Sequence, residues 1–111
     1  MSASAPAALD PVIHAPARLQ IAGVLAAVSE AEFAVVREAV GVSDSVLSKH
    51  LSALSEAGYV RLRKASTGGR QRTWLSITGA GRRAFAAHVK ALQALAGMAA
   101  HAPDLQAVAA E

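Results

Sequence analysis

The hydrophobic positions of residues 16–28 (PARLQIAGVLAAV) fit a helix that is apolar on nearly every side. Pro16 suits the first turn, where a backbone N–H has no helical partner. Leu19, Ile21, Val24, Leu25 and Val28 cannot all face one direction at about 100° per residue. Such a helix is buried on two sides. In so short a chain, we expect one of those sides to contact a second subunit.

A second helix is expected to follow the sequence SEAE at 29–32. These residues fit a capping box, with Ser29 as the cap and Glu32 reaching back to it. Phe33, Val36 and Val40 then recur on one face at helical spacing. Gly41 should end the helix, because glycine readily adopts a positive φ. The short gap before the next helical pattern predicts a helix-turn-helix.

The stretch DSVLSKHLSALSE, capped by Ser43 or Asp44, predicts a third helix with two unlike halves. One half carries leucines together with His50, for which a hydrogen-bonded core position is favoured. The other half begins with short hydroxyl side chains and a lysine, which can approach base edges and phosphates closely. The alternative is an ordinary amphipathic helix whose polar face meets only solvent. Its position after a two-helix turn favours DNA, with these candidate contacts: Ser43, Asp44, Ser45, Ser48, Lys49 and Ser52.

Two alternating stretches, YVRLRKA and RTWLSIT, predict a β-hairpin over residues 59–78. Val60 and Leu62 should share one side, as should Leu75 and Ile77, with Trp74 pointing away. The intervening STGGRQ supplies the glycines of a tight tip. Basic residues on such an arm can hold phosphates or enter a minor groove, although an arginine-bearing hairpin is often only a solvated edge. The candidate DNA contacts of this arm are Arg61, Arg63, Lys64, Arg70 and Arg72.

A long final helix is expected from Gly79 to about Ala99, with Thr78 as its N-cap. Its apolar residues form a seam close to the coiled-coil period. Packing on its own domain would explain the seam. A helix of about 20 residues exceeds the needs of so small a core, so a dimer stalk is favoured. The expected dimer interface combines the first and last helices: Leu19, Val24, Phe85, Val89, Leu92 and Leu95.

Composition and charge place these elements in one small basic domain. We expect a flexible tail over 1–14, a domain over 15–100 and a second flexible tail over 101–111. Residues 43–83 hold eight basic and two acidic residues, a net charge of +6, whereas the remainder has a net charge of −3. This concentration of positive charge is typical of a polyanion-binding face. No signal peptide or membrane-length apolar run is seen, which favours a cytoplasmic protein.

Catalysis and metal binding have little support in the sequence. There are no cysteines, and His88 and His101 lie 13 residues apart with few carboxylates nearby. Ser48 and His50 point about 200° away from each other on a helix and cannot form a catalytic dyad. No phosphate-binding glycine loop is present. We therefore expect no catalytic residues, no metal ligands and no cofactor.

The order of elements, with LSKHLSALSEAGYV, a basic GGR wing and LSIT followed by GRR, resembles the winged helix-turn-helix domain. It is most similar to compact transcriptional regulators related to the MarR and ArsR groups. The resemblance covers about His14 to Leu95 and implies a mainly α fold with a small β-hairpin wing. The chain lacks the cysteines of ArsR metal sensors and is shorter than typical MarR proteins.

This resemblance implies a homodimer that binds double-stranded DNA as a transcriptional regulator, with repression as its simplest mode. Residues 43–54 would form the recognition helix, with Ser45, Ser48, Lys49 and Ser52 facing DNA and with Arg70 and Arg72 as wing contacts. The terminal helices would form the dimer. Two alternatives remain open: a winged helix that docks another protein, and a regulator switched by a small molecule or metal. No effector is assigned.

Overall fold

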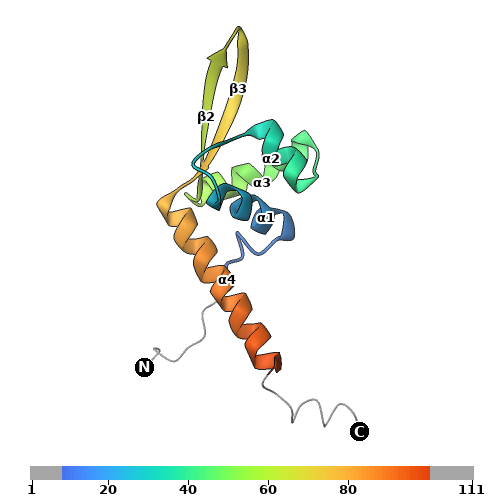
Figure 1. Cartoon of the computed structure of the whole chain (residues 1–111), viewed down its shortest axis with the longest axis vertical. Coiled ribbons are helices and arrows are strands. Elements are labelled where there is room, and N and C mark those ends of the chain that lie inside the picture. The colour runs from blue at the N-terminus through green and yellow to red at the C-terminus, as the bar shows by residue number, and fades with distance from the viewer. Residues whose placement is uncertain (1–8, 101–111) are drawn as a thin grey trace.

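The computed structural model describes residues 9–100, which form four helices and a three-stranded antiparallel sheet (Figure 1). The fold is mainly α with a β-hairpin wing, as predicted. The elements in chain order are α1 (Pro16–Ala26), β1 (Ala31–Glu32), α2 (Phe33–Val40), α3 (Asp44–Glu56), β2 (Val60–Thr67), β3 (Arg70–Ile77) and α4 (Gly79–Ala100).

Helix α1 lies at the centre of the core, in contact with α2, α3, α4 and β3. Ile21 and Leu25 are fully buried, and Leu19 and Val24 are half-buried against the same core. Val28 lies beyond the end of the helix and is 41% exposed. Much of the apolar surface of α1 is therefore covered by the chain itself, while Leu19 and Val24 stay partly exposed.

The segment before α2 differs from the expected capping box. Ala31 and Glu32 form a short strand that pairs with Leu75 and Trp74 of β3. Glu32 occupies the extended N-cap position of α2, without a side-chain capping bond. The prediction that Ser29 caps this helix was therefore wrong, because strand pairing holds these residues extended.

The turn between α2 and α3 is formed as the sequence predicts. Gly41 has φ 77°, and its N–H donates to the carbonyl oxygen of Arg37 at 2.8 Å. An L-residue with a side chain would be strained in this left-handed conformation. On the core side of the turn, Val36 of α2 is fully buried. The glycine thus ends one helix and lets the next begin three residues later.

The wing is a hairpin of β2 and β3, joined through Gly68 and Gly69, which both have positive φ. The register places Leu62 opposite Leu75 and Arg63 opposite Trp74. Leu75 is fully buried, whereas Leu62 is 42% exposed. The hairpin extends away from the helices (Figure 1). Leu62 therefore stays accessible on the side of the sheet that faces α3.

Helix α4 starts at a satisfied cap and continues well past the domain (Figure 1). The Thr78 hydroxyl accepts a hydrogen bond from the Gly81 N–H at 3.0 Å and donates one to the Gly58 carbonyl at 2.6 Å. His88 and Ala91 are buried. Leu95 is 51% exposed, so the rest of the described chain does not cover the distal end of the predicted seam.

The segment over residues 9–14, expected to belong to a flexible tail, packs against the domain. Ile13 is fully buried in the core, and the Arg18 guanidinium donates to the Val12 carbonyl at 3.1 Å. Burying such a side chain contributes about 1.5–3 kcal/mol relative to leaving it exposed, which favours the docked position of this segment. The remainder of that assigned tail (1–8) and the second one (101–111, with His101) lie outside the described residues. No helix within residues 9–100 is both long and apolar enough to cross a membrane.

Candidate nucleic-acid interface

Helix α3 has a well-defined start and a polar outer face. The Ser43 hydroxyl accepts a hydrogen bond from the Val46 N–H at 3.2 Å, satisfying one otherwise unpaired donor of the first turn. The inner face is anchored by three leucines that are at most 1% exposed: Leu47, Leu51 and Leu54. The predicted DNA-facing residues Ser45, Ser48, Lys49 and Ser52 are all exposed. The packing of α3 therefore turns its hydroxyls and lysine outward.

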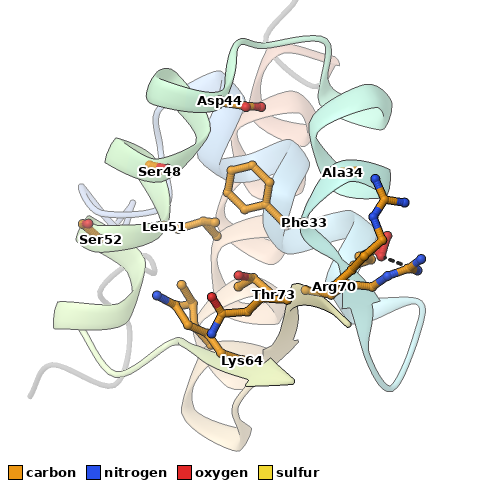
Figure 2. Close-up of a pocket in the computed structure, with 13 residues that line it drawn as sticks. Phe33, Ala34, Asp44, Ser48, Leu51, Ser52, Lys64, Arg70 and Thr73 are labelled. Carbon is orange, nitrogen blue, oxygen red and sulfur yellow. Dashed lines mark hydrogen bonds and ion pairs between the residues drawn. The ribbon is translucent and has the colours of Figure 1, made fainter. Parts of the chain in front are cut away.

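A groove of about 730 Å³ separates α3 from the wing (Figure 2). One wall carries Ser48 and Ser52 of α3, and the facing wall comes from both wing strands. Its apolar lining includes Phe33, Leu51 and Leu62. The fold thus brings together part of both predicted sets, since Ser48 and Ser52 precede the groove-lining basic residues of the wing by 12 to 24 positions. The polar and charged residues that line the groove are Glu32, Asp44, Ser48, Ser52, Lys64, Arg70, Gln71, Arg72 and Thr73.

Two of the five candidate wing residues are paired with carboxylates. The Arg63 guanidinium donates to both carboxylate oxygens of Glu30, at 2.9 and 2.8 Å, and Arg72 donates to Glu32 at 3.0 Å. The hydrogen bond from Arg63 holds the pKa of Glu30 below its usual value. Within residues 9–100, the remaining three candidates form no ion pair: Arg61, Lys64 and Arg70.

Arg37, which sequence analysis did not single out, meets the start of α3. Its guanidinium donates to Asp44 at 2.7 Å and lies 3.7 Å from Glu38. The hydrogen bond from Arg37 to Asp44 raises the pKa of Arg37. The pair joins α2 to α3 across the turn at Gly41, and it occupies the carboxylate of Asp44 with a partner from the same chain. Only the turn geometry brings these two residues together, so helical periodicity gave no signal for them.

His50 is half-buried between α3 and α1. Its Nδ1 accepts a hydrogen bond from the Arg18 guanidinium at 3.2 Å. Burial lowers the pKa of His50, and the positive charges of Arg18 and Lys49 lower it further. The hydrogen bond from Arg18 and these effects together favour the neutral form of the ring.

A second polar network, unforeseen in the sequence, joins the N-terminal segment to α4. The Asp10 N–H donates to Nδ1 of buried His88 at 3.0 Å, and Nε2 of His88 lies 3.3 Å from Nδ1 of His14. The Tyr59 hydroxyl donates to the Asp10 carboxylate at 2.7 Å. Burial raises the pKa of Asp10, but the hydrogen bonds from Tyr59 and Val12 outweigh it and hold that pKa below its usual value.

This network fits a structural role better than a metal site. Nδ1 of His88 must act as an acceptor for the Asp10 N–H, so the ring proton belongs on Nε2, which faces His14. A metal at Nε2 would require the proton on Nδ1, against the Asp10 donor. Within residues 9–100, no group of three or more potential metal ligands comes together.

Comparisons with known proteins agree with this geometry. A family model described as a winged helix DNA-binding domain matches residues 17–96. The uncharacterised protein MJ0432 of Methanocaldococcus jannaschii is 32% identical over 74 residues, covering 67% of this chain and 80% of that protein.

Solved structures show the same fold. A transcriptional regulator homologue from Pyrococcus horikoshii superimposes with a TM-score of 0.73 at 24% identity, covering 78% of this chain and 85% of that one. PcaV from Streptomyces coelicolor, a transcriptional regulator solved with its natural ligand, gives a TM-score of 0.67 at 24% identity, covering 90% and 71%. These two solved regulators share its fold, and the chain belongs to the winged helix DNA-binding domain family.

Proposed function

We propose that the protein binds specific double-stranded DNA sequences as a homodimeric transcriptional regulator. The observation that carries this proposal is the exposed row of hydroxyls and lysine on α3, which lies across a groove from a basic hairpin. Short polar side chains on an exposed helix can reach base edges, while arginine and lysine hold phosphates. The two walls provide both kinds of contact side by side.

In the proposed complex, α3 enters the major groove and the wing lies beside it. Ser45, Ser48, Lys49 and Ser52 would face the bases and the nearby backbone. Arg70, close to the Gly68–Gly69 tip, would reach phosphates or the minor groove. Lys64 lines the same groove and is unpaired among the described residues, so it would add a phosphate contact.

The dimer is proposed to form through α4 together with α1. Leu19, Val24 and Phe85 pack half-buried at the edge of the core, and Val89 and Leu92 continue that surface along α4. The seam ends in exposed Leu95. Two-fold pairing of these residues would cover them and present two recognition helices to half-sites about 34 Å apart.

Repression is the proposed mode, because a small domain bound at a promoter can block polymerase without an additional activating surface. Transcriptional regulators with this fold include PcaV, solved with its natural ligand. A ligand that raised the melting temperature of this protein would indicate a comparable switch.

The proposal is tested by fluorescence anisotropy of the purified protein with a pool of short duplexes, from about 50 to 200 mM salt. Lys49→Ala or Ser48→Ala should weaken binding selectively at particular base positions. Arg70→Ala should weaken it for all sequences and reduce the salt slope by about one. Lys90→Ala, an exposed charge on α4, is the charge-matched control and should have no effect.

Two results would count against the proposal. Unchanged affinity in both sets of variants would show that this surface does not contact DNA. No binding at low salt by folded protein would show that the winged helix serves a partner protein instead.

A further inference from the structure

Three side chains contact one another in series on the face of the sheet that is turned away from the core. They are Glu30, Arg63 and Trp74. Leu75 is buried on the core side, so Trp74, next to it in β3, lies on the opposite face of the sheet. Arg63 lies opposite Trp74 in β2 and shares that outer face. Its guanidinium lies 5.8 Å from the centre of the Trp74 ring and continues to Glu30, just before β1.

Arg63 is held more completely than the other candidate DNA contacts. Two of its nitrogens, Nε and one terminal nitrogen, donate to the two oxygens of Glu30, and the planar group lies against an indole. A bidentate charged pair fixes the orientation of an arginine as well as its position. The contact with the aromatic ring adds a cation–π attraction. Arg63 does not line the groove beside α3, whereas Lys64, its neighbour, does.

The hairpin needs an attachment of this kind. Only two residues of β1 pair with β3, whereas β2 and β3 pair over eight positions. A two-stranded hairpin is at best marginally stable by itself. Arg63 reaches from β2 across β3 to the residue before β1, so the chain of contacts spans all three strands.

We propose that Glu30, Arg63 and Trp74 form a wing clamp that sets the angle of the hairpin relative to α3, and that Arg63 is a positioning residue rather than a phosphate contact. This inference rests on the proposed DNA-binding function. Arg72 differs from Arg63, because it makes a single contact with Glu32 and lines the groove. Arg72 therefore remains a candidate DNA contact.

The clamp can be observed without DNA, because Trp74 is the only tryptophan of the chain. Arg63→Ala and Glu30→Gln should both shift the emission of Trp74 and increase its quenching by acrylamide. Arg70→Ala, at the far end of the hairpin, is the matched control and should leave both signals unchanged. Circular dichroism of each variant checks that the domain is folded.

DNA binding supplies the second measurement. Arg63→Ala and Glu30→Gln should each weaken binding by about twofold to fivefold with an unchanged salt slope, the range for one exposed charged pair. Arg70→Ala should reduce the slope by about one. This split separates loss of wing position from loss of a phosphate contact.

Two outcomes would overturn the clamp. If Glu30→Gln tightened binding and steepened the salt slope, Glu30 would be masking an arginine that contacts DNA. If neither Arg63→Ala nor Glu30→Gln changed the Trp74 signals, the clamp would not exist in solution. By contrast, wild-type protein that fails to bind DNA but shows the expected Trp74 response would overturn the proposed function, with the clamp still supported as the attachment of the hairpin.

Discussion

Helices α3 and α4 are both amphipathic, but the chain covers their apolar faces to very different extents. The leucines of α3 are at most 1% exposed along its whole length, whereas α4 is covered only as far as Leu92 and leaves Leu95 and Met98 exposed by 51% and 67%. A helix whose apolar face is satisfied has only its polar face left for a partner. The contrast supports the proposals that α3 contacts a polar partner such as DNA and that α4 contacts an apolar one such as a second subunit.

The largest expected difference lies between two leucine truncations. Leu47→Ala should reduce the free energy of unfolding by about 2–5 kcal/mol, because it leaves a cavity in a packed core. Leu95→Ala should change it by about 0.5 kcal/mol or less in dilute protein, and should shift sedimentation toward the monomer.

Urea denaturation at two protein concentrations measures both effects. The loss of unfolding free energy in Leu95→Ala should depend on protein concentration, because a subunit partner stabilises by mass action. The loss in Leu47→Ala should not. Equal, concentration-independent costs would contradict the division between the two helices.

Substitutions at two glycines, one at each end of α4, compare its packed end with its projecting end. A Cβ at Gly81 would collide with the carbonyl of Tyr59 and the side chain of Ile77, whereas one at Gly97 would meet nothing within 4 Å. Gly81→Ala should therefore cost about 1–3 kcal/mol of stability. Gly97→Ala should stabilise the helix by about 0.5–1 kcal/mol. Thermal unfolding of both variants measures this, and a destabilising Gly97→Ala would indicate a tight helix–helix contact there.

The smallest expected effect is the pH dependence contributed by His50 of α3. Because the pKa of His50 is lowered in the folded protein, the unfolded chain binds more protons as the pH falls below about 6.5. Its contribution to stability is thus present above that pH and is lost as the pH falls through the lowered pKa. Unfolding measured from pH 7.5 to 5 should show a smaller decline in His50→Gln than in the wild type. An equal decline would mean that the ring is not held neutral.

The parts of the fold that were predictable from sequence are those determined by local pattern. The three leucines of α3, the glycine at the end of α2 and the glycine pair of the hairpin each identify an element from its neighbours alone. The wing and the helix α3 could therefore be predicted, and the fold brings Ser48 and Ser52 opposite Lys64 and Arg70.

The remaining features depend on residues far apart in the chain. Strand β1 consists of two residues and exists only because β3 pairs with it. The pair of Glu30 and Arg63 spans 33 positions, and that of Asp10 and His88 spans 78. Periodicity cannot report contacts of this kind, which arise when the fold brings separate segments together. For that reason the five basic residues of the wing looked equivalent in the sequence.

The burial of Ile13 determines where the domain can be cut. A shortened chain that begins at Pro16, where the first helix starts, would lose a fully buried side chain and the backbone donor that satisfies His88. It would expose the apolar surface beneath Ile13 and leave a buried imidazole nitrogen unpaired, so poor solubility is the expected result. Purification tags and fusion partners should accordingly be joined ahead of Leu9, so that the folding unit stays intact.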